Sequence, residues 1–409
     1  MRAYERLIKY TQYPTVSDGK SPTCPSTAVQ LEFGKALVAE MLEIGIKDAF
    51  IDEHGYVYGT IPATKEDAKG PVIGFIAHMD VSSDAPWDPV VTKIIKDYDG
   101  GDIELSEGIV MAAGEYQVLE SCIGHDLLVT DGKTLLGGDN KAGIAEILAM
   151  AEHLINHPEI PHGTIKIGFT PDEEIGRGAD LFDVKGFGAD YAYTVDGGAF
   201  GEVEYETFSA FSADITIRGV SIHPGVAKNK LLNASLIAME FNQMLPQAQR
   251  PEHTENREGF YHLIEMSGRV EEAKLSYILR DHEDEIVEKR VEVVHEIGAY
   301  LNKKYGVGTV TVETKEWYRN MKKVIKEHWH LIENAYKGVE AVGGTPHSIP
   351  IRGGTDGSRL SFMGLPCPNL GTGTYNAHSR FEFVSIQSMD KAVESLIEIA
   401  KLYADYEVK

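Results

Sequence analysis

Five side chains in this sequence are of the types that bind metal ions, and each follows or ends a short apolar or glycine-rich stretch. They are His78, Asp139, Glu174, Asp196 and His378. Hard and borderline divalent metals take imidazole nitrogen and carboxylate oxygen, and a catalytic site keeps one position open for water. Two histidines and three carboxylates suit two ions, each with one histidine and one terminal carboxylate, that share the third carboxylate. We expect Asp139 to be the shared ligand.

Two further acidic residues lie beside the expected ligands. Glu173 directly precedes Glu174, and adjacent side chains beyond a strand point in different directions, so one can hold a metal while the other faces its bound water. Asp80 lies two residues after His78, on the same side of the strand, and could orient the imidazole. Taken singly, each of these residues is more often a surface group, a turn residue or a helix cap. The hypothesis therefore depends on their meeting in space.

Three apolar segments are expected to bring these residues together. The run 71–77 is almost continuously apolar, which is typical of a strand buried on both faces of a parallel sheet, and the segments 164–170 and 191–195 resemble it. The segment 144–154 has the spacing of a helix packed on that sheet. Because side chains from different strands converge at the carboxyl edge of an α/β sheet, this edge is the expected site. The fold prediction is an α/β catalytic domain with a mixed, mainly parallel sheet.

A second domain is expected where the pattern changes to strict alternation, from about residue 208. Helix and strand patterns then follow in the order β-α-β-β-α-β, with the first helix expected at 229–245, which predicts a ferredoxin-like α+β module. We place this module as a lid inserted at 208–318, with the catalytic domain formed by 1–207 and 319–409. No chemistry is assigned to the turn-rich segment 81–135.

Composition limits the classes of protein and partner. A chain of 409 residues is long enough for two domains, and no apolar run is long enough to span a membrane. The formal net charge of −24 disfavours nucleic acids and anionic membranes as partners. Three cysteines without CxxC spacing argue against disulfides and thiolate zinc sites, and fit the cytoplasm. The oligomeric state stays open.

Several motifs together resemble a known family. They are HMD at 78–80, GGDNKAGIAEI at 137–147, TPDEEIGRGA at 170–179, YTVDGG at 193–198, SIHPG at 221–225, IRGGTDGS at 351–358 and YNAH at 375–378. In these strings the chain resembles the dinuclear-zinc exopeptidases and deacylases, and among them the tripeptide aminopeptidases, over essentially its whole length. The resemblance implies a zinc-exopeptidase-like catalytic domain with an inserted lid, two Zn²⁺ per chain, and short peptides, tripeptides above all, as substrates.

Carried over by position, the resemblance also implies a role for each site residue. His78 and Asp196 would bind one zinc ion, Glu174 and His378 the other, and Asp139 both. Glu173 resembles the family's general base, which takes a proton from the attacking water and later delivers it to the leaving amine. Asp80 resembles the carboxylate that steers His78, and a cis peptide bond is expected after Asp139.

The expected lid carries candidates for substrate binding. His223 resembles a residue that contacts the substrate carbonyl, although His-Pro-Gly is also a turn sequence. Arg280 resembles the residue that receives the terminal carboxylate of the peptide, for which a planar guanidinium is well shaped, but a surface salt bridge would also explain it. Asn320 and Arg352, in the expected second part of the catalytic domain, are further candidates.

Two alternatives are left open by the sequence. The same metal core would serve a carboxypeptidase, a dipeptidase or an N-acyl amino acid deacylase. A protein that holds metals structurally and binds peptides without catalysis is the alternative from another class, and Glu173, which a closed structural site would not need, argues against it.

Overall fold

The computed structural model of the chain describes residues 1–65, 69–87, 89–404 and 406–407, which fall into two compact units. Unit 1 comprises Met1–Tyr205, Lys323–Ile349 and Thr355–Lys409, and unit 2 comprises Glu206–Lys322 and Pro350–Gly354. The segment Pro350–Gly354 was expected in the catalytic domain. It belongs to unit 2 because its backbone pairs there: Ile351 N–H donates to the Glu206 carbonyl and Phe208 N–H to the Gly353 carbonyl.

A seven-stranded mixed sheet forms the centre of unit 1, in the order β1-β2-β8-β3-β9-β15-β10. Its strands are β1 (Phe50–Ile51), β2 (Val57–Ile61), β3 (Ile73–His78), β8 (Ile165–Thr170), β9 (Tyr191–Gly197), β10 (Val203–Glu204) and β15 (Asn369–Gly371). The four central strands β8, β3, β9 and β15 run parallel, while the outer pairs are antiparallel. Every residue of β3 is buried, as its apolar sequence predicts. The prediction of a mixed α/β domain is confirmed.

Helices surround this sheet. They are α1 (Ala3–Tyr10), α2 (Ala28–Ile44), α3 (Gly138–Asn156), α4 (Val184–Phe187), α7 (Lys322–Ile325), α8 (His330–Ala341), α9 (Asp356–Phe362) and α10 (Ile386–Leu402). Helix α3 packs on β3 and β9 and also contacts α1 and α10, so nearly all its side chains are buried. Among the described residues, no helix combines the length and the apolar character needed to cross a lipid bilayer.

Two small sheets lie beside the main one. One has the order β16-β17-β7-β4, and β5 pairs with β6. Their strands are β4 (Thr92–Ile95), β5 (Ile103–Ser106), β6 (Ile109–Met111), β7 (Leu127–Thr130), β16 (Thr374–Tyr375) and β17 (Phe383–Ser385). The pairing of β17 with β7 joins the turn-rich segment 81–135 to the C-terminal part of the chain, which contains His378.

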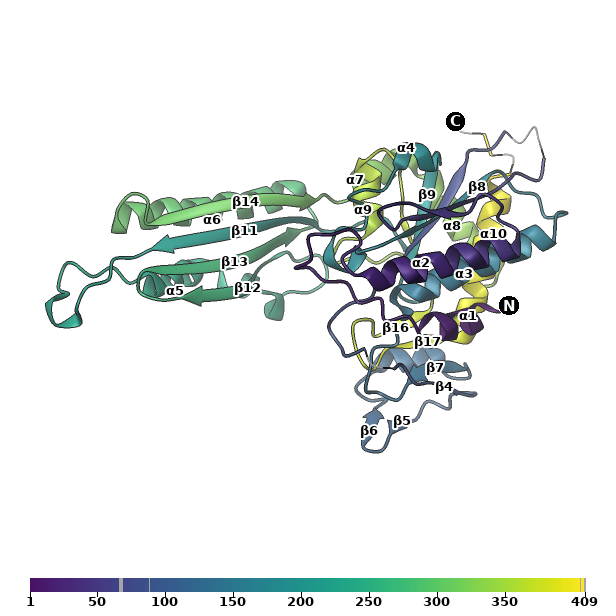
Figure 1. Ribbon diagram of the computed structural model, residues 1–409, viewed down its shortest axis with the longest axis horizontal. Helices are drawn as coiled ribbons and strands as arrows, with labels where there is room; N and C mark the ends of the chain where they lie inside the picture. The colour runs from purple at the N-terminus through teal and green to yellow at the C-terminus, as the bar shows by residue number, and fades with distance from the viewer. Residues whose placement is uncertain (66–68, 88, 405, 408–409) are drawn as a thin grey trace. The chain divides into compact units, whose positions relative to one another are not determined.

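Unit 2 is a four-stranded antiparallel sheet with two helices on one face, α5 and α6 (Figure 1). Its elements are β11 (Ser209–Arg218), α5 (Ala234–Met244), β12 (Phe260–Gly268), β13 (Glu272–Asp281), α6 (Asp284–Tyr305) and β14 (Val310–Tyr318). The strand order β12-β13-β11-β14 is that of a ferredoxin-like module. The alternation in β11 buries Ala213, Ile215 and Ile217 in a core shared with both helices.

The ends of unit 2 are fastened to one another. Asn320 Oδ1 accepts hydrogen bonds from the backbone N–H groups of Thr207 and Lys322, at 3.1 and 3.0 Å. The buried carboxylate of Glu206 accepts hydrogen bonds from Nη1 and Nη2 of Arg257 and, at 2.9 Å, from the Lys322 ammonium. Burial opposes ionisation of this carboxyl, but these hydrogen bonds outweigh it and lower the pKa of Glu206 to about 2.

Replacing Glu206 with Gln should therefore destabilise unit 2 in a pH-dependent way. Charged hydrogen bonds contribute about 1.5–3 kcal/mol each, so we expect a loss of about 2–3 kcal/mol at pH 7. A depressed folded-state pKa gives stability that is complete above the unfolded value of 4.5 and is lost as pH falls through 2. Urea unfolding should show a smaller difference from wild type at pH 3 than at pH 7. Glu265→Gln, on the exposed part of β12, should change stability by less than about 0.5 kcal/mol, and equal effects of the two substitutions would contradict the prediction.

Candidate metal centre

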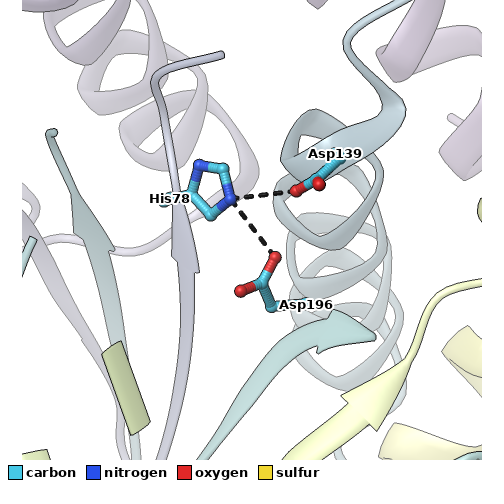
Figure 2. A group of neighbouring side chains, drawn as sticks. All are labelled: His78, Asp139 and Asp196. Carbon is cyan, nitrogen blue, oxygen red and sulfur yellow. Dashed lines mark hydrogen bonds and ion pairs between the residues drawn. The ribbon is translucent and has the colours of Figure 1, made fainter. Parts of the chain in front are cut away.

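The carboxyl ends of the parallel strands β3, β8 and β9 carry the expected ligands to one edge of the sheet. His78 is the last residue of β3, Asp196 lies near the end of β9, and Asp139 lies at the start of α3. The Nε2 atom of His78 lies 3.0 Å from Asp139 Oδ1 and 3.2 Å from Asp196 Oδ1 (Figure 2). One ligand atom from each of the three residues falls within 4.8 Å of the others.

A second group of potential ligands shares Asp139 with the first. His378 Nε2 lies 3.0 Å from Glu174 Oε2 and 3.4 Å from Asp139 Oδ2. Asp139 therefore turns Oδ1 toward one histidine and Oδ2 toward the other. Five residues from remote parts of the sequence thus form two adjoining ligand groups with one common carboxylate.

The backbone of Asp139 is held by a residue outside the motifs described above. The buried carboxylate of Glu382 accepts backbone hydrogen bonds from Leu136, Gly137 and Asp139, at 3.1, 2.8 and 2.8 Å. Gly137 adopts a left-handed conformation with φ 76°, which glycine adopts without steric cost, so the chain can turn sharply into α3. The Asp139–Asn140 peptide bond is cis, as the family resemblance implies.

Two buried aspartates hold the Glu173–Glu174 turn, a 3₁₀ turn at Glu173–Ile175. Asp80 Oδ1 and Oδ2 accept hydrogen bonds from the N–H groups of Glu173 and Glu174, at 2.9 and 3.1 Å. Asp172, whose φ of 60° places it in the left-handed region, accepts from Ser26 N–H and Oγ and from Gln30. The sequence indicated a role for Asp80 toward His78, and its Oδ1 does lie 3.4 Å from His78 Nδ1. Its clamp on the glutamate backbone, and the role of Asp172, were missed.

The Glu173 carboxyl lies beside His78 but belongs to neither ligand group. Its Oε2 atom is 3.9 Å from His78 Nε2, which is beyond direct hydrogen bonding. Burial raises the pKa of Glu173 well above its ordinary value. The arrangement places a carboxyl with raised proton affinity next to the cluster.

The cluster concentrates negative charge in a largely buried place. Burial raises the pKa of Glu174 to about 7 and that of Asp196 to about 6. Hydrogen bonds to Asp139 and Glu174 raise the pKa of His378 to about 12. For Asp139, burial acts upward, but hydrogen bonds from His378 and His78 outweigh it and lower the pKa. The ionised carboxylates of this centre thus need positive charge beside them, from protonated histidines or from bound cations.

Divalent cations fit this centre on two grounds. The donor set of imidazole nitrogens and carboxylate oxygens is one that zinc accepts. Within the described parts of the chain, Glu174 Oε1 is buried without a hydrogen-bond partner, although an unpaired buried oxygen of this kind is costly. A cation shared with His378 would satisfy it.

The four residues expected to bind substrate lie in unit 2. His223 is exposed, and its Nδ1 accepts a hydrogen bond from Gly225 N–H, which is the turn geometry of the His-Pro-Gly sequence. Asn320 joins the ends of the unit, as described above. The Arg352 guanidinium donates to the carbonyls of Asn256, Glu258 and Thr254.

Arg280 differs from these residues in its unused hydrogen-bonding capacity. It lies near the end of β13, and its Nη1 donates to the Arg352 carbonyl at 3.3 Å. Its Nε is buried and, among the described residues, has no hydrogen-bond partner. Arg280 is therefore the candidate best able to donate a further hydrogen bond to an anionic group.

Comparisons with known proteins define the class. The sequence model of peptidase family M20/M25/M40 matches residues 137–402. A curated relative, peptidase T of Caldanaerobacter subterraneus subsp. tengcongensis, is 51% identical over 404 residues, which is 98% of either chain. The chain belongs to peptidase family M20/M25/M40.

Solved structures agree with this assignment. Aminopeptidase PepT from Bacillus cereus aligns over 98% of both chains with a TM-score of 0.75 and 25% identity. A tripeptidase from Staphylococcus aureus, at 22% identity, aligns over 99% of this chain and 98% of its own with a TM-score of 0.77, and shares the fold.

Proposed function

We propose that this protein is a metal-dependent aminopeptidase that removes the N-terminal residue from tripeptides, with two zinc ions bound per chain. The observation that carries the proposal is the pair of ligand groups that share Asp139, with the separate carboxyl of Glu173 beside them. The names of similar proteins, peptidase T, aminopeptidase PepT and tripeptidase, support the choice of substrate.

Each residue of the centre has a proposed task. His78 and Asp196 would hold one ion, Glu174 and His378 the other, and Asp139 both. When bound, such ions would polarise the scissile carbonyl and make a water molecule more acidic. Glu173 would accept the proton of the attacking water and deliver it to the leaving amine, because it lies outside both ligand groups and has a high proton affinity. Asp80 would orient His78 and fix the backbone of Glu173.

Substrate recognition is proposed for unit 2. Arg280 would bind the C-terminal carboxylate of the peptide, because a guanidinium can donate two parallel hydrogen bonds and this one has an unused buried N–H. Recognition of that carboxylate would favour peptides of one length. The proposed roles of His223, Asn320 and Arg352 in binding stay predictions.

Peptide hydrolysis by the purified zinc-loaded protein tests the proposal. We expect release of the N-terminal amino acid from tripeptides, slower cleavage of dipeptides and longer peptides, and no cleavage of N-acetylated tripeptides. Activity should disappear with a chelator and return when Zn²⁺ is added back.

The alternatives give different products in the same assay. Release of the C-terminal residue would indicate a carboxypeptidase, and faster cleavage of N-acetyl amino acids a deacylase. A protein that binds two ions but cleaves none of these substrates would favour the non-catalytic peptide-binding alternative.

A further inference from the structure

Each histidine of the candidate metal centre has ligand carboxylates at Nε2 and an aspartate at Nδ1. His78 turns Nε2 toward Asp139 and Asp196, and its Nδ1 lies 3.0 Å from the Asp80 carbonyl and 3.4 Å from the Asp80 carboxylate. His378 turns Nε2 toward Asp139 and Glu174. Its Nδ1 also lies beside a carboxylate, which comes from the turn-rich segment 81–135.

That carboxylate belongs to Asp84. Asp84 Oδ2 lies 2.8 Å from His378 Nδ1. The same oxygen accepts a hydrogen bond from Ser82 Oγ at 2.7 Å, and Ser82 Oγ in turn accepts from Asp84 N–H at 3.1 Å. Because Ser82 is buried, its hydrogen bond holds the Asp84 carboxylate in place independently of His378.

The backbone that carries His378 forms a sharp turn. His378 and Asn376 have φ values of 62° and 55°, in the left-handed region that non-glycine residues rarely adopt. The turn is held by Asn376 Nδ2, which donates to the Phe381 carbonyl at 3.2 Å. Within the described residues, Asp84 is the hydrogen-bond partner of the His378 ring on the side away from Asp139 and Glu174.

We propose that Asp84 is a positioning residue that prepares His378 to bind the second metal ion, an inference that rests on the proposed function. A histidine that binds a metal through Nε2 must keep its proton on Nδ1 and leave the Nε2 lone pair free. A carboxylate that accepts the Nδ1 proton fixes this tautomer, fixes the ring orientation and makes Nε2 more basic. Asp84 would thus have the role toward His378 that is proposed for Asp80 toward His78.

The expected loss of metal affinity depends on how exposed the side chains of Asp84 and His378 are to water. Loss of such an outer partner typically weakens metal binding by about 10–100-fold. The side chains of Asp84 and His378 are 61% and 44% exposed, so water can partly replace the contact. We therefore expect the low end of that range.

The test measures the affinity of each zinc equivalent in the metal-free full-length protein by competition with a chelating dye. Asp84→Ala should lower the affinity for one of the two zinc ions by about tenfold and change the affinity for the other by less than about twofold. The zinc ion that binds more weakly should be the same one whose binding His378→Ala weakens. Asp84→Asn keeps a neutral acceptor and should give a smaller change, and Ser82→Ala a smaller change in the same direction.

Asp99→Asn provides the matched control, because Asp99 is an exposed aspartate that accepts a backbone hydrogen bond from Gly101 and its loss changes the net charge equally. It should alter neither equivalent. Wild-type affinity for both equivalents in Asp84→Ala would overturn the inference, and so would an equal weakening of both, which indicates a general structural disturbance. A wild-type protein that binds fewer than two ions would overturn the proposed function itself.

Discussion

Replacing Glu173 with Gln is expected to lower kcat for tripeptides by about 10²–10⁴-fold while the protein still binds two metal ions. Glutamine has nearly the same shape, but its amide cannot take up the proton that the attacking water gives away. Metal content should persist because Glu173 lies outside both ligand groups, with Oε2 at 3.9 Å from His78 Nε2. KM should change little, since the lost interaction acts in the transition state.

Steady-state kinetics together with metal analysis check this expectation. Glu120→Gln, on an exposed side chain of unit 1, removes the same charge and should leave kcat within about twofold of wild type. If Glu173→Gln keeps wild-type activity, Glu173 is not the general base. If it loses metal as well as activity, its place is among the ligands.

Replacing Asp139 with Ala is expected to weaken the binding of both metal ions, whereas replacing His378 with Ala should weaken the binding of one. The reason is that Asp139 Oδ1 lies 3.0 Å from His78 Nε2 and Oδ2 lies 3.4 Å from His378 Nε2, so a single carboxylate serves both groups. Activity should fall with the metal content, because the proposed reaction needs the ions to polarise the scissile carbonyl and to make the attacking water more acidic.

Zinc stoichiometry by elemental analysis after dialysis, compared between the two variants, measures this difference. Asp139→Ala also removes the contacts with His78 and His378 that lower the pKa of Asp139, so the metal-free variant should melt below the metal-free wild type. Retention of both ions in Asp139→Ala would show that the carboxylate is not shared.

The main sheet and its edge could be predicted from the sequence because their signals are local. Continuous burial of β3 follows from its apolar run, and the parallel rule then brings its carboxyl end beside those of β8 and β9. The ferredoxin-like order of unit 2 followed from alternation and helical spacing in the same way. Boundaries were less accurate: the helix expected from residue 229 begins at Ala234, because Asn233 caps it by accepting from the N–H groups of Ser235 and Leu236.

The residues that support the site could not be predicted in this way. Glu382 and Asp172 act on backbone N–H groups and side chains that lie far away in the sequence, and a carboxylate in such a role leaves no periodic pattern. Asp84 and His378 lie 294 residues apart in the sequence, so no local pattern could indicate their contact. Asn320 and Arg352 were singled out by type and position, but their bonds to backbone groups within unit 2 depend on tertiary structure.

The fastening of Glu206 and Thr207 to Asn320 and Lys322 has a consequence for the order of folding. Unit 2 interrupts the sequence of unit 1, so residues before and after it would have to meet across a long disordered loop if unit 1 formed first. Once unit 2 has folded, its joined ends reduce that loop to a few residues. Closure entropy grows with the logarithm of loop length, which makes the difference on the order of 3 kcal/mol. Early folding of the inserted module would thus speed assembly of the surrounding sheet.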